Sequence, residues 1–131
     1  MGTIPDSHAD LLNKQGFAHV STTMPDGGPH SAVVWFDWDG EHILVSTKEQ
    51  SRKVRNAQRD PRVAVIITDP ENPYRYLELW GRVERIDPDP EAKLADVLSE
   101  KYTGQPFNAP RPDEGRVRVA IRPERSFTWG S

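Results

Sequence analysis

The sequence contains no cysteine. Disulfides, thiolate zinc sites, iron–sulfur clusters and cysteine nucleophiles are therefore all excluded. Long apolar runs are also lacking, and none approaches the ~20 residues of a membrane-spanning helix. The sequence does not show the basic start followed by an apolar run that is typical of a secretory signal. The 17 Lys and Arg residues against 20 Asp and Glu residues give a formal charge of −3, which does not favour nucleic-acid binding. We therefore expect a cytoplasmic protein whose single domain spans residues 1–131 and binds neither nucleic acid nor a membrane.

The common catalytic motifs are missing as well. The nine glycines form neither a dinucleotide-binding fingerprint nor a phosphate-binding loop. No Gly-x-Ser-x-Gly elbow is present, so a hydrolytic triad is not supported. The four histidines show no metal-ligand spacing, and no metal site is predicted.

Turn signals and alternating residues predict a mainly β fold. Turns at 25–29 and 39–40 favour antiparallel neighbours, and a capping box of Ser7 and Asp10 predicts the first helix. The expected helices cover 6–12, 51–60 and 91–102, and the expected strands cover 17–23, 30–38, 41–47, 63–68, 74–86, 116–121 and 126–129, with a proline-rich loop over 103–115. The regular alternation of a doubly wound fold is missing. A small antiparallel β-barrel with peripheral helices fits this pattern best.

Residues 48–62 carry six basic and two acidic side chains, a local charge of +4 in an acidic chain. Ser51 is placed to begin a helix, which puts Arg52 and Lys53 in its first turn. Cations there are unfavourable next to the positive end of the helix dipole, by roughly 0.3–1 kcal/mol each. Free N–H groups, a hydroxyl and two cations together predict a phosphate site. The alternative interpretation is a solvated basic helix face.

Besides the basic segment, the sequence carries a set of large aromatic side chains: Trp35, Trp38, Tyr76, Trp80 and Trp129. In the strand over 74–86, Leu77 and Leu79 alternate with Tyr76 and Trp80, so one face is expected in the core and the other against a partner chain or a ligand. Flat rings near a phosphate site suit a stacked heterocycle. Packing in the core or in a dimer is the alternative.

Taken in order, several segments resemble the flavin-reductase-like split barrels of the pyridoxamine 5′-phosphate oxidase superfamily. They are His30 to Phe36, Val45-Ser46-Thr47, Ser51-Arg52-Lys53, Arg59-Asp60-Pro61-Arg62, Trp80 to Ile86, and Arg122 to Trp129. Residues 69–78 look most like the actinobacterial members that use the deazaflavin coenzyme F420. The resemblance implies a six-stranded antiparallel split barrel of the FMN-binding type, and a homodimer with cofactor at the subunit interface.

The resemblance also implies where the cofactor lies. The phosphate would be held by Ser51, Arg52 and Lys53, and the acidic tail would be met by Lys48 and Arg55. The strand from Ser31 to Trp35 would line the ring. The full set is Ser31, Val33, Val34, Trp35, Ser46, Thr47, Lys48, Ser51, Arg52, Lys53, Arg55, Asn56, Tyr76, Trp80 and Trp129, with Tyr76 a candidate proton donor and solvent its alternative. The oxidases carry an arginine near the start of this strand, where the present sequence has His30 and Ser31.

These implications favour an F420-dependent reductase that transfers a hydride to a conjugated, electron-poor small molecule such as an enone or quinone. Two alternatives stay open: an FMN-binding oxidase or flavin reductase of the same fold, and a non-catalytic carrier of F420. The substrate itself is not predicted from the sequence.

Overall fold

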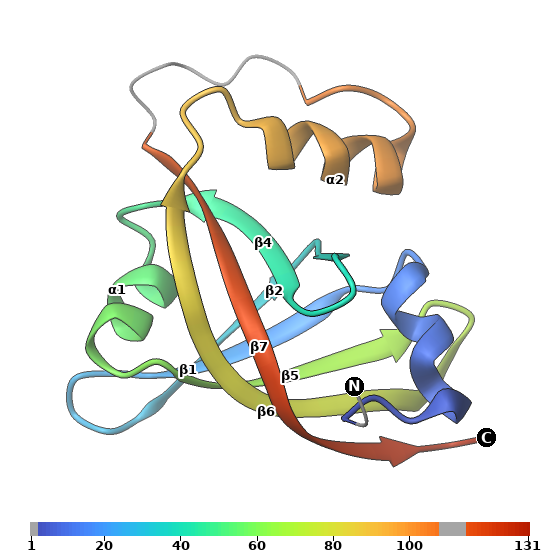
Figure 1. Cartoon of the computed structure of the whole chain (residues 1–131). Coiled ribbons are helices and arrows are strands. Elements are labelled where there is room, and N and C mark those ends of the chain that lie inside the picture. The colour runs from blue at the N-terminus through green and yellow to red at the C-terminus, as the bar shows by residue number, and fades with distance from the viewer. Residues whose placement is uncertain (1–2, 108–114) are drawn as a thin grey trace.

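Seven antiparallel strands form the body of the protein in a computed structural model, which describes residues 3–107 and 115–131 (Figure 1). The strands lie in the order β2-β1-β5-β6-β7-β4-β3. The elements in chain order are η1 (Asp6–Asn13), β1 (Ala18–Thr23), β2 (Pro29–Val34), β3 (Asp37–Trp38), β4 (Ile43–Lys48), α1 (Arg52–Arg59), β5 (Arg62–Asp69), β6 (Asn72–Pro88), α2 (Lys93–Thr103) and β7 (Arg116–Trp129).

The sheet curls into a barrel that stays split between its two edge strands. Within the described residues β2 and β3 do not pair with each other. The long strands β6 and β7 bend around the barrel, α2 lies over one end, and α1 lies at the side (Figure 1). The predicted split β-barrel with peripheral helices is confirmed, with seven strands in place of six.

The core is built by the inward residues of the alternating strands. Among the described residues, the largest fully buried side chains include Phe36, Ile43, Ile67, Leu77 and Ile121. Gly81 belongs to the same inward face, and a Cβ there would lie 2.1 Å from the carbonyl oxygen of Arg122. Glycine at this position therefore lets β6 and β7 approach closely.

Three sequence predictions differ from the structure. The expected strand over 30–38 is broken after Val34: its first half pairs with β1 and its second half, β3, with β4. The two expected C-terminal strands are one continuous strand, because the register shift at Trp80 and Gly81 places the N–H-lacking Pro123 opposite Gly81. The segment 6–13 is a 3-10 helix without a side-chain cap, and the hydroxyl of Ser7 bonds His8 instead of closing a capping box.

The second long helix also begins later than predicted, at Lys93. The carboxylate of Asp89 accepts hydrogen bonds from the backbone N–H groups of Lys93 and Leu94 and so caps the helix. The predicted loop over 103–115 lies mostly outside the described residues. Within the described residues, no helix is long and apolar enough to cross a membrane.

A charged network fastens the β3–β4 hairpin to β6 and β7. His42, only 3% exposed, lies between two carboxylates, with Nε2 2.6 Å from Glu84 and Nδ1 3.2 Å from Asp39. Arg122 bonds the other side of Glu84 and also reaches Glu41. Burial by itself lowers the pKa of His42, but the hydrogen bonds to Glu84 and Asp39 outweigh it and raise that pKa overall.

Candidate functional site

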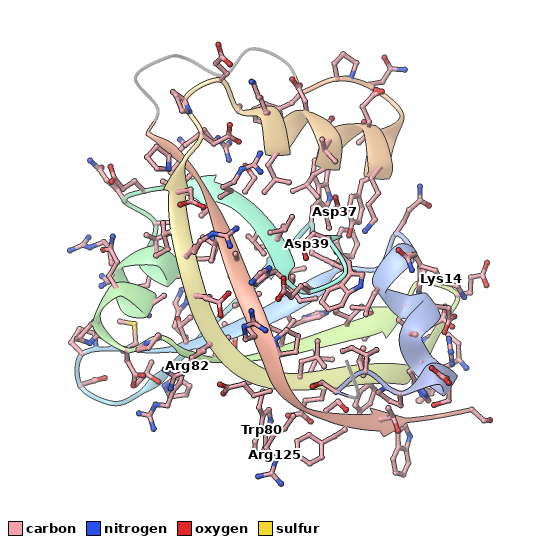
Figure 2. All side chains as sticks on the ribbon, in the orientation of Figure 1. Lys14, Asp37, Asp39, Trp80, Arg82 and Arg125 are labelled. Carbon is pink, nitrogen blue, oxygen red and sulfur yellow. The ribbon has the colours of Figure 1, made fainter. Side chains whose placement is uncertain are left out.

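The outward face of β6 and the end of β7 exposes a patch of large rings. Trp80 is 45% exposed, Phe127 40% and Trp129 63%. The Trp80 ring lies 4.7 Å from that of Phe127, and its Nε1 donates a 2.8 Å hydrogen bond to Glu78. Figure 2 shows Trp80 and Arg125 pointing away from the barrel on the side opposite α2. The predicted division of β6 into a core face and an outer face is confirmed.

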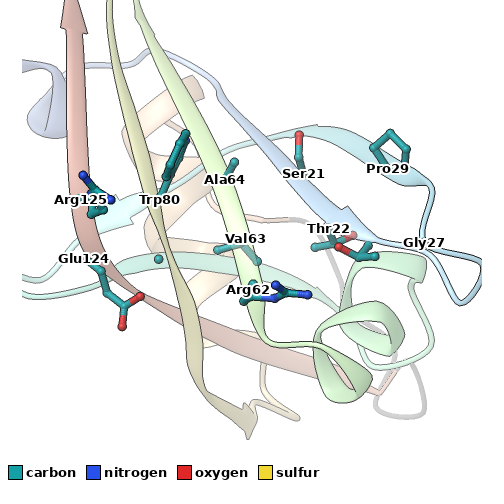
Figure 3. Close-up of a pocket in the computed structure, with 12 residues that line it drawn as sticks. Ser21, Thr22, Gly27, Pro29, Arg62, Val63, Ala64, Trp80, Glu124 and Arg125 are labelled. Atoms are coloured by element: carbon teal, nitrogen blue, oxygen red, sulfur yellow. The ribbon is translucent and has the colours of Figure 1, made fainter.

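Two adjoining hollows lie on this outer face. The first, of about 550 Å³, is lined by Ser21, Thr22, Thr23, Gly27, Pro29, Arg62, Val63, Ala64, Trp80, Gly81, Glu124 and Arg125 (Figure 3). The second, of about 570 Å³, is lined by His19, Ser21, Ser31, Ala64, Ile66, Thr68, Pro73, Tyr76 and Glu78. Ser21 and Ala64 belong to both, so small side chains make the floor. Two predicted ring contacts, Ser31 and Tyr76, are brought together in the second hollow.

The predicted phosphate residues lie at the start of α1. Ser51 stands at the N-cap position, yet its side chain makes no cap hydrogen bond. Its Oγ is buried and has no partner among the described residues. Lys53 is half-buried at the first turn, where burial and the nearby positive charge of Arg116 lower its pKa. A buried hydroxyl without a partner next to mutually repelling cations suits an anion, which would satisfy both.

The neighbouring hydroxyls of β4 lie on opposite faces of the strand. Thr47 is buried with the inward residues of the strand, whereas Ser46 points outward, toward α2. Ser46 lines a third cavity, of about 210 Å³, together with Val34, Trp35, Ala95, Leu98, Phe107 and Arg116. The Oγ of Ser46, like that of Ser51, is buried without a partner in the described part of the chain. Three predicted residues, Val34, Trp35 and Ser46, thus meet in this cavity.

Arg116 is a candidate site residue that the sequence did not indicate. It stands opposite Lys48 in the pairing of β4 with β7, which brings it to the end of the chain segment that carries the predicted phosphate residues. Its guanidinium lies 5.0 Å from the centre of the Phe107 ring. The pairing of a C-terminal strand with 43–48 is the signal that identifies Arg116, and it is not readable from one sequence.

Asn56 makes a contact inside the chain. It is 0% exposed, and its amide donates to the hydroxyl of Thr22 at 3.0 Å. In this position it joins α1 to β1 and presents no surface to a ligand. Farther along the helix, Arg59 bonds the carbonyl of Thr23, and Arg62 pairs with Asp60. Only the first part of the basic segment is therefore left for a ligand.

Trp35 belongs to a stack of three rings. Its indole lies 5.2 Å from the ring of Tyr102 at an angle of 8°, and Tyr102 lies 5.9 Å from the ring of Phe17. The Tyr102 hydroxyl donates to the carbonyl of Gly16 and accepts from the N–H of Phe36. Burial raises the pKa of Tyr102 to about 12, so this phenol stays protonated and holds the stack together.

The predicted residues thus fall into two groups on different sides of one chain. Ser46, Ser51 and Lys53 lie at β4 and α1, and Ser46 faces α2. Tyr76, Trp80 and Trp129 lie on β6 and β7, where Tyr76 pairs with Trp129, and Trp80 points away from the barrel on the side opposite α2 (Figure 2). Of the remaining predicted residues, Val33 is 62% exposed on β2, and Lys48, Arg52 and Arg55 are exposed at the end of β4 and along α1.

This fold is that of the FMN-binding split barrels. The chain belongs to the pyridoxamine 5′-phosphate oxidase family, whose pattern matches residues 4–130.

Several individual proteins are similar to this chain over most of its length. A solved structure described as an F420 reductase is 36% identical, covers 95% of this chain and 98% of its own, and superposes with a TM-score of 0.88. A conserved hypothetical protein from Mycobacterium tuberculosis is 31% identical over 98% of this chain and 88% of its own, with a TM-score of 0.76. The 5a,11a-dehydrotetracycline/5a,11a-dehydrooxytetracycline reductase of Streptomyces rimosus is 30% identical over 125 residues, which is 91% of this chain and 78% of that protein.

Proposed function

We propose that this protein is an oxidoreductase that uses coenzyme F420 to reduce a conjugated, electron-poor small molecule. The observation that carries this proposal is the anion site at the start of α1. There the buried hydroxyl of Ser51, which has no partner among residues 3–107 and 115–131, lies close in the chain to half-buried Lys53, whose charged form is disfavoured by burial and by the positive charge of Arg116. The likeness to an F420 reductase over nearly the whole chain supports the deazaflavin over FMN.

The residues present fit a phosphorylated cofactor. Ser51 and Lys53 supply a hydroxyl and an ammonium group, the donors that phosphate oxygens accept. Arg52, in the same helical turn, adds a guanidinium that forms no ion pair within the described residues. When bound, the reduced deazaflavin supplies a hydride to an electron-poor carbon of the acceptor, which then takes up a proton from solvent or from a side chain.

The protein's own contribution is to bind, orient and exclude water. Ser31 and Val33 offer the strand along which the ring would lie, and Tyr76 supplies a ring and a phenol from the outer face. Tyr76 is the proton donor that we propose, with solvent as the alternative source.

The proposal includes a homodimer, and the outer face of β6 and β7 supports it. The exposed rings of Trp80, Phe127 and Trp129 form an apolar surface of the kind that marks an interface. A cofactor site completed by residues of a second copy is therefore part of the proposal. One chain alone leaves the two groups on different sides of the barrel.

The direct test is ligand-induced thermal stabilisation, with F420 and FMN in parallel. At a ligand concentration about 100 times Kd, binding adds about 2.7 kcal/mol, on the order of 10 °C in melting temperature for a domain of this size. We expect a large shift with F420 and a small one with FMN. A shift with FMN alone makes the protein an FMN oxidase or flavin reductase, and no shift with either removes the cofactor proposal.

Turnover separates the enzyme from a carrier. Oxidation of reduced F420 can be followed by its absorbance in the presence of a panel of enones and quinones. We expect acceptor-dependent oxidation that rises with acceptor concentration. Tight F420 binding without turnover on any acceptor would favour a carrier.

A further inference from the structure

The C-terminal half of β7 has a strand neighbour on one side only in the described part of the chain. The pairing of β4 with β7 ends at Ile121, whereas the pairing with β6 continues to Trp129, which lies opposite Tyr76. The N-terminal segment contacts this half of β7 instead, and Figure 1 shows η1 beside the end of the strand. The hydroxyl of Ser126 donates to the carbonyl of Thr3. Chain ends usually fray unless they are tied down, and these contacts tie down the end of β7.

A buried histidine of η1 holds the last residue of β7. His8 is 3% exposed, and its Nε2 lies 3.1 Å from the carbonyl oxygen of Trp129. A carbonyl oxygen only accepts hydrogen bonds, so Nε2 is the donor. On the other side of the ring, Nδ1 lies 2.8 Å from the hydroxyl oxygen of Ser7. Both ring nitrogens are thus bonded inside the chain, and the imidazole is fixed in one orientation.

The residue after Trp129 is fixed as well. Gly130 has a φ of +83°, which favours glycine, and a Cβ there would lie 2.7 Å from the carbonyl oxygen of Tyr74 and 2.8 Å from the Cα of Arg75. The backbone therefore packs closely on β6 directly after Trp129. It is held at the Trp129 carbonyl and at the next residue, while Trp129 itself stays 63% exposed. A large ring on a fixed backbone loses less conformational freedom when it contacts a ligand or another chain.

The helix that carries His8 has its own anchor on β6. Arg75 donates hydrogen bonds to the carboxylate of Asp10 at 2.6 Å and to the carbonyl of Ser7 at 2.8 Å. It also donates to the carboxylate of Asp69 at 3.0 Å. The hydrogen bond from Arg75 lowers the pKa of Asp10 to about 2, so this carboxylate is ionised at neutral pH. Because these bonds do not involve the imidazole, loss of the His8 side chain is expected to free the end of β7 and leave η1 in place.

We propose that His8 is a positioning residue, which fixes Trp129 so that the indole is already ordered when it contacts the cofactor. The inference rests on the proposed function, in which Trp129 belongs to an F420 site that a second copy completes. It adds to that site a residue of η1 that acts through a backbone carbonyl and touches no ligand. The alternative is that the bond between His8 and Trp129 serves stability alone.

The first test needs no cofactor. Trp129 is one of four tryptophans, and its indole signal in a nitrogen–proton correlation NMR spectrum is the one that is missing from Trp129→Ala. We expect a backbone order parameter at Trp129 of about 0.85 in the native protein and below about 0.6 in His8→Met, with a matching change at the indole. His8→Gln, whose amide can still donate to the carbonyl, is expected to keep the native value. The control Ser7→Ala, which leaves the Nε2 bond in place, keeps it too.

The second test connects the order of Trp129 with the cofactor. The Kd for F420 is measured for the native protein, His8→Met, Trp129→Ala and the double variant, well below each melting temperature. We expect binding to weaken about tenfold in Trp129→Ala, as for a lost aromatic contact, and about three- to tenfold in His8→Met, as for the ordering of one side chain. In the Trp129→Ala background, His8→Met is expected to change Kd by less than about twofold, because its effect passes through the indole. His8→Gln should restore the native Kd.

Three results would overturn the inference while F420 binding stands. They are an unchanged order parameter at Trp129 in His8→Met, a native F420 affinity of that variant, and an equal loss of affinity in both backgrounds, as a general loss of stability would produce. No F420 binding to the native protein would overturn the cofactor proposal and this inference with it. The two failures are therefore distinguishable.

Discussion

The imidazole of His42 lies 2.6 Å from the carboxylate of Glu84, at the point where β6 bulges away from its regular pairing with β7. Arg122 on the other side of Glu84 is the main cause that lowers the pKa of that carboxyl to about 2. The pair therefore joins a buried imidazole, whose charged form is favoured, to a carboxylate, and it fastens the β3–β4 hairpin to the long strands of the barrel.

This contact predicts a pH dependence of stability. Because the pKa of His42 in the folded protein is raised above its ordinary 6.5, its stabilising effect is complete below about pH 6.5 and is lost as pH rises through the folded value. The free energy of unfolding, measured with urea, is expected to decline from pH 6 to pH 9. Glu84→Gln should lower stability at pH 6 by about 1 kcal/mol and flatten that decline. An equally steep decline in the variant would show that another group causes it.

Replacing Lys53 is expected to change stability and cofactor binding in opposite directions. Burial and the charge of Arg116 disfavour its ammonium form in the folded protein. Lys53→Met keeps the apolar stem, which packs against the end of the barrel interior. We expect a higher melting temperature without ligand, and F420 affinity weakened by about 1–3 kcal/mol. The control Lys93→Met, at an exposed position paired with Glu91, should change neither. Unchanged affinity in Lys53→Met would remove Lys53 from the site.

Replacing Asn56 distinguishes a structural role of this residue from a contact to the cofactor. Asn56→Ala leaves the hydroxyl of Thr22 without its partner in the core, and a loss of about 1–3 kcal/mol in unfolding free energy is expected. F420 affinity, measured well below the melting temperature, should be unchanged. Gln58→Ala, at an exposed position of the same helix, should cost under about 0.5 kcal/mol. Weaker F420 binding at full stability would restore the predicted contact.

The apolar outer face predicts the oligomeric state. Phe127→Asp places a charge in the proposed interface, whereas Val97→Asp does the same on α2, at a residue that is also exposed, 49% against 40%. Light scattering after size exclusion should report a dimer for the native protein and for Val97→Asp, and a monomer for Phe127→Asp with unchanged circular dichroism. A dimeric Phe127→Asp would place the interface elsewhere.

The sequence predicted those parts of the fold that depend on local pattern. Alternation along 74–86 separated Leu77 and Leu79 from Tyr76 and Trp80 correctly, and Ser51 was placed at the start of its helix. Features set by distant pairing were not predictable. The break after Val34 arises because the two halves of one apolar segment pair with two different strands, β1 and β4.

The same limit applies to the candidate site. Ser46 and Thr47 are neighbours in sequence, but strand alternation sends them to opposite faces. Arg116 joins the site through the pairing of β7 with β4, 68 positions from Lys48 in the chain (116 − 48). The resemblance implies that Asn56 contacts the cofactor, and in the structure its amide donates to Thr22 where α1 packs on β1.

The place of β7 in the sheet has a consequence for synthesis of the protein. In the described part of the chain, β4 and β3 are joined to the other strands only through β7, which lies between β4 and β6. Until β7 emerges from the ribosome, β4 and β6 each expose an unpaired edge. At a synthesis rate of roughly 5–20 residues per second, this interval lasts for seconds. Open strand edges recruit other chains, so the nascent protein depends on rapid arrival of its C-terminal segment to avoid aggregation.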